Sequence, residues 1–250
     1  MTLRYVGVCK SFGARHVLRD VSLEVRAGEC FFVIGASGVG KSVLARMAVG
    51  FVRPDAGQVW VDGDEVTAMD ERALRRVRRR CAMVFQASTL FDSMSCLDNV
   101  ALPLRIHGRL SLREARARAR DVLASIGIEE LADAWPAEIG DGSRKRVAIA
   151  RALTLEPTHL LLDEPTTSLD PISARRLDRF VRALCDERRL TVLVVSHDRT
   201  SVATVADRVA MLYRGRVHAL GTPAELFASS DGIVRQFLEG RAEGPMELDT

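Results

Sequence analysis

Lysine is scarce in this sequence. Only Lys10, Lys41 and Lys145 appear among the 36 lysine and arginine residues, and all the others are arginine. A lysine inside a motif therefore stands against a strong bias toward arginine. Aromatic residues are also few, at 5% of the chain, and none interleave the arginine-rich stretches as a stacking platform for single-stranded nucleic acid would require. We expect no nucleic-acid partner.

Cysteine pairs and long apolar runs are missing as well. The five cysteines form no CxxC pair, and their odd number and wide spacing argue against a zinc site or a disulfide framework and favour a reducing cytoplasm. No apolar run approaches the roughly 20 residues of a membrane-spanning helix. Residues 1–13 lack the apolar region of a signal peptide. If the protein works at a membrane, we expect another chain to supply the spans.

Short apolar runs alternate with helical patterns along the chain, and a final hairpin is expected around Arg214 and Gly215. Continuous apolar strands between helices indicate an α/β fold with a mostly parallel sheet covered on both faces. With 250 residues and 47% hydrophobic content, the chain can bury one large core. The predicted strands cover residues 30–34, 58–61, 82–85, 159–162, 191–195 and 209–213.

Residues 93–153 differ from the rest. Apolar positions there recur at helical spacing with arginines between them, which predicts an all-helical insertion in the α/β domain. Within it, residues 113–120 (REARARAR) would form the polar face of an amphipathic helix. Residues 72–80 (RALRRVRRR) are interpreted as a solvated basic face. Residues 240–250 are polar and contain proline and glycine, which predicts a terminal tail.

Residues 35–42, GASGVGKS, fit the phosphate-loop pattern GxxxxGK[ST]. The segment follows an apolar strand and precedes a helix predicted over residues 42–49, which is the context that supports the motif. Glycines let backbone N–H groups curl round an anion, and the helix dipole adds to the attraction. Lys41 would supply a cation to the β- and γ-phosphates, and Ser42 a hydroxyl to Mg²⁺. The expected nucleotide-binding residues are Gly35, Ala36, Ser37, Gly38, Val39, Gly40, Lys41, Ser42 and Val43.

Two later strand ends carry groups that suit phosphate chemistry. Residues 160–164 read LLLDE, so Asp163 can hold Mg²⁺ and Glu164 can orient or deprotonate an attacking water. The strand over residues 191–195 is followed by His197, which is placed to hydrogen-bond a γ-phosphate. Each feature alone is usually structural, but the phosphate loop already requires an acid at a neighbouring strand end.

Taken in order, these motifs resemble those of the nucleotide-binding subunit of ABC transporters over essentially the whole chain. The resemblance implies a P-loop NTPase of RecA-like fold, with an antiparallel β subdomain and an inserted α-helical subdomain, in one ABC ATP-binding domain. The core and β subdomain would occupy residues 1–92 and 154–239, the helical subdomain residues 93–153, and the tail residues 240–250. The matching motifs are Walker A at 35–42, the Q-loop at Gln86, the signature region at 139–143, Walker B at 160–165, the D-loop at Ser168-Leu169-Asp170 and the H-loop at His197.

The resemblance also implies a mechanism. Two subunits would face head to tail, each MgATP lying between the phosphate loop of one and the signature segment of the other, with Phe12 stacked on adenine. Glu164 would be the general base of the ATPase and His197 the γ-phosphate sensor. The implied metal ligands are Ser42, Gln86 and Asp163, and Gln86 would also contact the attacking water. The implied D-loop and signature residues are Asp170, Gly140, Asp141, Gly142 and Ser143.

A finer likeness is to the ATPase of Mla- or MCE-type lipid transporters. It is carried by QASTLFDSMSCLDNVALPLR (86–105) and VRQFLEGRAEGP (234–245). It implies a peripheral ATPase at the cytoplasmic face of the inner membrane that powers transport of phospholipid or another hydrophobic substrate. The implied partners are a membrane permease, docked through residues 86–105 and the helical subdomain, and a second ATP-binding subunit, identical or different. A small regulatory protein and a substrate-binding MCE-type protein are further candidates.

Other functions stay open. A soluble translation or DNA-repair ATPase is disfavoured because the chain holds one cassette, and because Lys41 and Asp163 are 122 positions apart with no sustained heptads between them. A regulatory cassette that binds ATP but hydrolyses it poorly, working with a second ATPase subunit, is a real alternative, and so is the ATPase of another ABC import system.

The signature segment is the reason for the regulatory alternative, because it reads IGDGS where the family has LSGGQ. Gly140 replaces the serine whose hydroxyl would bond the γ-phosphate, and Asp141 replaces the first glycine. A unit charge ~5 Å from another is worth roughly 3 kcal/mol at an effective dielectric of about 20. Asp141 either points at the γ-phosphate and impairs closure, or points away and caps the helix predicted over residues 142–153. We expect reduced but not absent hydrolysis.

Overall fold

The computed structural model describes residues 2–108 and 110–247, and within them the centre of the molecule is a six-stranded sheet. Its strand order is β10-β9-β3-β8-β7-β6, with β9, β3, β8, β7 and β6 parallel and β10 antiparallel at one edge. The strands are β3 (Cys30–Ile34), β6 (Cys81–Val84), β7 (His159–Asp163), β8 (Thr191–Val195), β9 (Arg208–Tyr213) and β10 (Arg216–Gly221).

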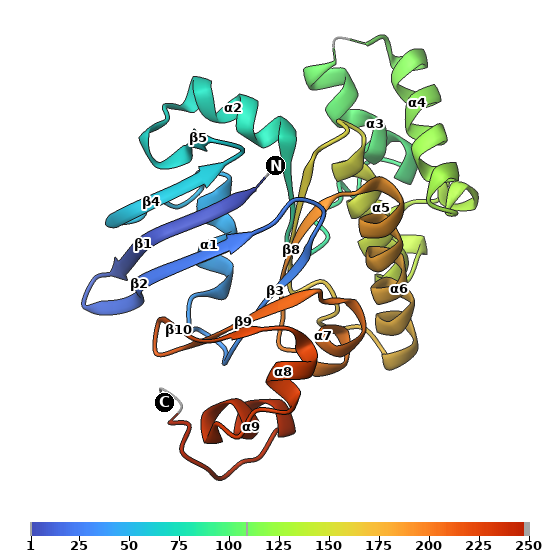
Figure 1. Cartoon of the computed structure of the whole chain (residues 1–250). Coiled ribbons are helices and arrows are strands. Elements are labelled where there is room, and N and C mark those ends of the chain that lie inside the picture. Colours follow the sequence, from blue (N-terminus) through green and yellow to red (C-terminus); the bar gives the residue numbers. More distant parts are fainter. Residues whose placement is uncertain (1, 109, 248–250) are drawn as a thin grey trace.

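A second, antiparallel sheet has the order β2-β1-β4-β5 and packs to one side of the first (Figure 1). Helix α1 (Lys41–Ala48) shares an apolar core with both sheets. In β1 the residues that face this core alternate with exposed ones, as expected for a strand with one solvated face. The strands are β1 (Leu3–Phe12), β2 (Arg15–Val25), β4 (Ala56–Val61) and β5 (Asp64–Glu65).

Strand β3 shows why the central strands are apolar at every position. Phe31 and Val33 belong to the core shared with α1 and the antiparallel sheet, whereas Phe32 and Ile34 belong to the core under the helices on the opposite face. Successive side chains of a strand point to opposite faces, so a sheet covered on both sides needs an unbroken apolar run. The predicted α/β fold with a mostly parallel sheet and an antiparallel β unit is therefore confirmed.

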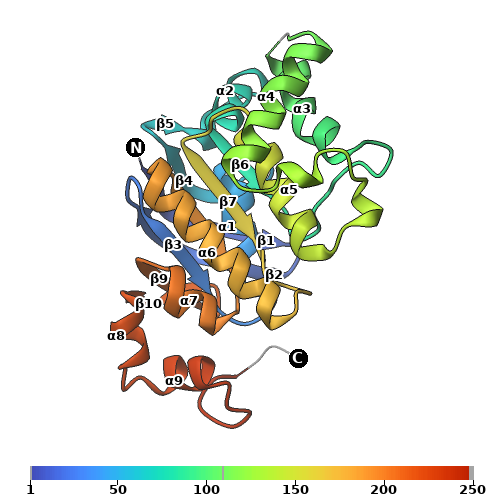
Figure 2. The ribbon, with the colours of Figure 1, turned by 90° about the vertical axis from the view of Figure 1, so that its right-hand side faces the viewer.

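Helices cover the other face of the central sheet, and α6 lies across it in Figure 2. Helices α3, α4 and α5 pack on one another beyond this layer, and α4 buries Ala115, Ala119 and Leu123 while its arginines stay outside. Ser111 and Glu114 form a capping box that fixes the start of α4. The helices are α2 (Glu71–Arg80), α3 (Cys96–His107), α4 (Leu112–Ser125), α5 (Asp141–Leu153), α6 (Pro171–Arg188), α7 (Arg199–Val205), α8 (Pro223–Phe227) and α9 (Gly232–Glu239), with 3₁₀ turns at Val66–Ala68, Glu129–Leu131 and Pro136–Glu138.

Several details differ from the sequence predictions. Strands β1 and β2 were not predicted, and β4 begins at Ala56 rather than at residue 58. The helix expected over 42–49 is α1, which begins at Lys41 and ends at Ala48. The helix expected over 142–153 begins at Asp141, because Gly140 rather than Asp141 occupies the N-cap position. Residues 240–247 of the predicted tail fold back on α9 and bury Met246, while residues 248–250 lie outside the described residues. None of the described helices is long and apolar enough to cross a membrane.

Candidate active site

The phosphate loop joins the C-terminal end of β3 to the first turn of α1. Gly35 has φ +143°, and a Cβ there would lie 2.4 Å from the carbonyl oxygen of Leu212. Gly40 has φ +108°, and a Cβ there would lie 2.6 Å from Leu18 Cδ2. A side chain at either position would be strained and would clash with its neighbours. The loop therefore depends on both glycines, as the GxxxxGK[ST] pattern predicts.

Lys41 curls back over the loop. Its Nζ donates to the carbonyl oxygens of Gly35 at 2.9 Å and Ala36 at 3.0 Å, and lies 3.7 Å from Glu164 Oε1. Burial lowers the pKa of Lys41, and the neighbouring Glu164 and Asp163 carboxylates oppose that shift. A buried ammonium tied to the loop that should receive phosphate is well placed to neutralise an incoming triphosphate.

Ser42 and Asp163 come from different elements and meet at the same point. The Ser42 hydroxyl donates to Asp163 Oδ1 at 2.6 Å, and Arg46 Nη2 lies 3.6 Å from Asp163 Oδ2. Asp163 ends β7 and is only 2% exposed. Among the described residues, no three His, Cys, Asp or Glu side chains cluster as a metal site. The oxygen pair of Ser42 and Asp163 nevertheless suits Mg²⁺, which prefers oxygen ligands and completes its shell with water and substrate phosphates.

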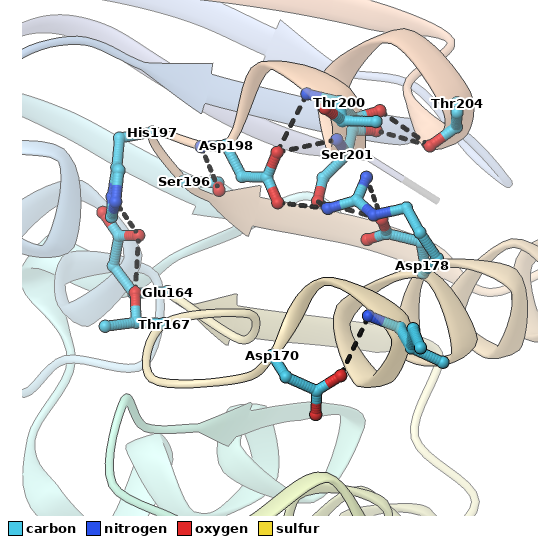
Figure 3. A network of polar contacts seen from close by, with 12 residues as sticks. Glu164, Thr167, Asp170, Asp178, Ser196, His197, Asp198, Thr200, Ser201 and Thr204 are labelled. Carbon is cyan, nitrogen blue, oxygen red and sulfur yellow. Dashed lines mark hydrogen bonds and ion pairs between the residues drawn. The ribbon is translucent and has the colours of Figure 1, made fainter.

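The carboxylate of Glu164 lies between the side chains of Lys41 and His197. Its Oε1 faces Lys41, and its Oε2 is 2.8 Å from His197 Nδ1 and accepts a hydrogen bond from Thr167 Oγ1 at 3.3 Å (Figure 3). Glu164 has φ +50°, a left-handed conformation that is unfavourable for a side chain other than glycine. Its backbone N–H donates to Val195 O of the neighbouring strand at 2.8 Å, which holds this conformation.

A cavity of about 540 Å³ brings most of the predicted residues together. Phosphate-loop residues line it together with Phe12, Gln86, Glu164 and His197. Thr167, Val17 and Phe237 also line it, although none of them belongs to a motif that predicts a site residue. The sequence carries a signal for Thr167, since it lies three residues after Glu164 in the same turn. Phe237 lies in a segment used only for the lipid-transporter likeness.

A polar network joins the segment after Asp170 to the segment after His197 (Figure 3). Asp170 caps α6, accepting N–H bonds from Ile172 and Ser173 at 2.9 and 3.0 Å, and its bonding to Ser173 lowers its pKa. Asp198 caps α7, and Arg175 of α6 forms ion pairs with Asp198 and, at 2.7 Å, with Asp178. Burial raises the pKa of Asp178. The ion pair of Arg175 with Asp198 thus links α6, which begins directly after Asp170, to α7, which begins two residues after His197.

The signature residues Gly140–Ser143 and Asp170 do not line the cavity of the phosphate loop. Asp141 lines a separate cavity of about 360 Å³, together with Gln86, Lys145 and Thr167. Lys145 donates a hydrogen bond to the backbone carbonyl of Gln86, and burial lowers the pKa of Lys145. Gln86 and Thr167 line both cavities, so they lie between the phosphate loop and the signature helix of the same chain.

Asp141 does not take the helix-capping orientation, which is one of the two alternatives that the sequence leaves open. It is the first residue of α5, and its side chain makes no capping bond. Its Oδ1 lies 3.3 Å from Arg144 Nη1, and Arg144 Nε donates to the carbonyls of Pro136 and Ile139 at 2.7 and 3.0 Å. The alternative in which Asp141 caps the helix is therefore wrong, because Gly140 holds the N-cap position. The orientation toward the γ-phosphate of a second chain's nucleotide stays a prediction. A neighbouring guanidinium partly compensates its charge.

The comparison with known families agrees with this site. A sequence profile described as "ABC transporter" matches residues 18–167, which include the phosphate loop, Gln86, the signature segment and Glu164. The chain belongs to the ABC transporter family. It is an ATPase of this family and the ATP-binding subunit of an ABC transporter.

Relatives and solved structures support the same assignment. The chain is 39% identical over 248 residues to the methionine import ATP-binding protein MetN of Mesorhizobium japonicum, covering 98% of this chain and 68% of that protein. It is 36% identical over 242 residues to the probable ribonucleotide transport ATP-binding protein mkl of Mycobacterium tuberculosis, covering 97% and 67%. It therefore spans about two thirds of these relatives.

Among solved structures, the dimeric form of MJ0796, a bacterial ABC transporter cassette, superposes with a TM-score of 0.80 at 30% identity, covering 88% of this chain and 98% of that chain. A second dimeric structure of MJ0796 is a post-hydrolysis state bound to ADP and Pi. The predicted P-loop NTPase fold and the predicted ATPase activity class are confirmed.

Proposed function

We propose that the chain binds MgATP in the cavity of the phosphate loop, hydrolyses it at a site completed by a second copy of the chain, and thereby powers a separate membrane permease. The observation that carries this proposal is the position of Glu164. Its carboxylate lies at the mouth of the phosphate loop, within 3.7 Å of Lys41 Nζ and 2.8 Å of His197 Nδ1. No other carboxylate lines this cavity among the described residues.

The chemistry follows from these neighbours. Lys41 would leave Glu164 and turn to the β- and γ-phosphates when ATP enters, because a triphosphate offers it a stronger partner. Glu164 would then accept a hydrogen bond from the attacking water, and His197 would donate to a γ-phosphate oxygen. Mg²⁺, held by Ser42, Asp163 and Gln86, would supply charge neutralisation at the phosphates.

The second copy would supply Gly140–Ser143 and Asp170, which lie outside the cavity of their own chain. A head-to-tail pair would bring one chain's α5 N-terminus over the other chain's triphosphate, where backbone N–H groups stabilise negative charge. The dimeric arrangement of the MJ0796 cassette supports this pairing.

The loop before α3 supplies a surface for the permease. Asn99, which is fully buried, accepts the N–H of Phe91 at 2.8 Å and donates to the carbonyls of Phe91 and Met94 at 3.0 and 3.2 Å. These bonds fix a loop that leaves the Phe91 ring 50% exposed. A rigid loop with an exposed aromatic ring is typical of a protein-binding surface. We assign permease docking to residues 86–105, at the cytoplasmic face of the inner membrane.

The proposed substrate is a phospholipid or another hydrophobic molecule carried by an MCE-type system. The support for it is the likeness of residues 86–105 and 234–245 to such ATPases, whereas the relatives named above are described as methionine import and ribonucleotide transport proteins. Affinity purification of the chain from detergent-solubilised membranes of its own host tests this proposal. A permease and an MCE-type protein should co-purify with the parent and be lost with Phe91→Ala but not with Phe227→Ala, an exposed phenylalanine on α8. Co-purification of an amino-acid or nucleotide permease alone would refute the lipid assignment.

The hydrolysis proposal has its own test. Glu164→Gln should bind ATP as tightly as the parent while its steady-state ATPase rate falls by about a hundredfold or more, the scale of loss expected for a general base. Glu187→Gln is the control. Glu187 is an acidic residue of α6 that does not line the cavity of the phosphate loop, so this variant should leave the ATPase rate unchanged. An unchanged rate in Glu164→Gln would refute the assignment.

A further inference from the structure

Helix α2 carries a stripe of exposed arginines along one face. Leu74 and Val77 bury the opposite face of the helix in the core beneath the antiparallel sheet. The exposed arginines follow the spacing i, i+3, i+4 and i+7, which places them on one side of an α-helix. This arginine stripe consists of Arg72, Arg75, Arg76 and Arg79.

The acidic side chains near α2 are paired with other arginines. Glu71, the one acidic residue of the helix, accepts a hydrogen bond from Arg78 Nη1 at 2.9 Å. Asp64 of β5 forms an ion pair with Arg80. Within residues 2–108 and 110–247, no member of the arginine stripe forms an ion pair. The chain itself therefore leaves the positive charge of the stripe uncompensated.

This arrangement is unfavourable for the helix. Like charges four residues apart destabilise a helix, and the stripe contains two such pairs, Arg72 with Arg76 and Arg75 with Arg79. Arg72 also lies in the first turn, where the helix dipole disfavours a cation. A cationic face that weakens its own helix and has no partner within the chain is suited to an anionic partner outside it.

The position of α2 indicates which anionic partner meets the stripe. Helix α2 lies beside the α3–α4 pair in both Figure 1 and Figure 2. A cavity of about 230 Å³ is lined by Arg78 of α2 together with Pro103 and His107 of α3. Helix α3 contains the end of residues 86–105, the segment assigned above to permease docking. If that assignment holds, α2 lies next to the membrane in which the permease is embedded.

We infer that the arginine stripe binds anionic lipid headgroups of the membrane beside the permease. Guanidinium groups pair with phosphate oxygens in a planar and often bidentate geometry. Each arginine close to an anionic membrane surface strengthens binding about fivefold, which corresponds to about 1 kcal/mol. Helix α2 contains no aromatic residue, so it offers no stacking surface for single-stranded nucleic acid. The inference rests on the proposed function only for the side of the chain that faces the membrane.

The test measures binding of the full chain to lipid vesicles, without permease or nucleotide. Partition coefficients are obtained by sedimentation with vesicles of phosphatidylcholine alone and of phosphatidylcholine mixed with phosphatidylglycerol. The parent should bind the mixed vesicles and not the neutral ones. Arg75→Gln with Arg76→Gln, the α2 variant, should bind the mixed vesicles about 25-fold more weakly, since two arginines are lost.

A charge-matched control separates the stripe from the net charge of the chain. Arg176→Gln with Arg179→Gln, the α6 variant, removes two exposed arginines from a helix that packs on the opposite face of the central sheet. It should bind the mixed vesicles as the parent does. The inference is overturned if the parent binds both kinds of vesicle alike or binds neither, if the α2 variant binds as the parent does, or if the α6 variant loses as much.

Two further measurements exclude unfolding and a nucleic-acid partner. The α2 variant should melt no lower than the parent, because it relieves repulsion along the helix. If it does melt lower, Arg72→Gln with Arg79→Gln removes the outer arginines of the stripe and should give the same 25-fold loss. Tighter binding of the parent to duplex DNA than to the mixed vesicles, lost in the α2 variant, would assign the stripe to nucleic acid and overturn the inference.

The inference and the proposed permease docking fail separately. Phe91→Ala should bind the mixed vesicles as the parent does, because Phe91 is not part of the arginine stripe. Loss of vesicle binding in the α2 variant together with a permease that still co-purifies in detergent supports the lipid contact. Loss of the permease in the α2 variant, with no vesicle binding by the parent, would show that the stripe meets the permease and would overturn the inference.

Discussion

Repair of the signature segment is the most informative change to make in this chain. The variant Gly140→Ser with Asp141→Gly restores the serine hydroxyl and removes the carboxylate. Gly140 has no heavy atom within 4 Å of where a Cβ would lie and has φ −70°, so a serine fits there without strain. Asp141 makes no capping bond, so its loss costs α5 little beyond the ion pair with Arg144.

The size of the effect depends on how dry the closed interface becomes. If the Asp141 carboxylate lies ~5 Å from a γ-phosphate, one pair of unit charges repels by about 0.8 kcal/mol at the dielectric of water and by roughly 3 kcal/mol at an effective dielectric of about 20. The Asp141 side chain is 60% exposed in the single chain and has Arg144 beside it. The smaller repulsion energy therefore applies if water stays between the two chains, and the larger one if their contact excludes it. We therefore expect loss of the Asp141 charge alone to speed ATP hydrolysis by about fourfold to about a hundredfold.

The assay is steady-state phosphate release by the parent and the variants, each reconstituted with the permease. Asp141→Asn isolates the charge, because it keeps the shape of the side chain, and Gly140→Ser alone isolates the hydroxyl. We expect Asp141→Asn to show the gain from the lost charge and Gly140→Ser to add about 1 kcal/mol of transition-state stabilisation as one new hydrogen bond, so the repaired variant should gain from both. A repaired variant that is no faster than the parent would refute the claim that these two positions limit hydrolysis.

Three further perturbations follow from particular contacts. Arg116→Met removes the partner whose hydrogen bonds, at 2.7 and 2.8 Å, lower the pKa of Asp98. A depressed carboxyl pKa stabilises the fold above the unfolded value of 3.8, and this stabilisation is lost as the pH falls through the folded value. The variant should therefore melt at a lower temperature than the parent at pH 7, and the difference should shrink as the pH falls below 3.8. Arg175→Met should lower the free energy of unfolding by about 1–3 kcal/mol, measured by urea denaturation, because it leaves Asp178 with fewer partners. Burial lowers the pKa of Lys41, so the nucleotide-free lysine loses its proton at a lower pH than an ordinary ammonium does. Since triphosphate favours the charged form, the Kd for ATP should already rise with pH below the ordinary lysine pKa of 10.5, and a flat profile there would contradict this.

The central elements were predictable because their constraints are local. The run CFFVI, the glycines of residues 35–42 and the carboxylates after LLL each reflect one requirement: a strand covered on both faces, a loop that clashes with any side chain, and an acid at a strand end. Parallel strands then bring Ser42 and Asp163 to one edge of the sheet although 121 positions separate them.

The parts that were missed depend on contacts with no local signal. The fold-back of residues 241–247 is set by one long-range acceptor, the Gln236 side chain, and by the burial of Met246. A polar, glycine-containing stretch reads as a tail whether or not such an acceptor exists. Asp141 pairs with Arg144 because α5 begins one residue earlier than predicted, at Asp141. Helix propensities do not predict the first residue of a helix to that precision.

The central claim is that each ATP site is built from two chains, and mixing two inactive variants tests it most directly. Lys41→Ala removes the phosphate-loop cation, and Gly142→Asp blocks the signature segment. In a head-to-tail dimer, a mixed pair contains one site with both defects and one intact site. If the subunits exchange freely, half of the dimers are mixed and each keeps one of two sites, so the mixture should regain about a quarter of the parental ATPase rate. A mixture that stays as inactive as its components would contradict the account.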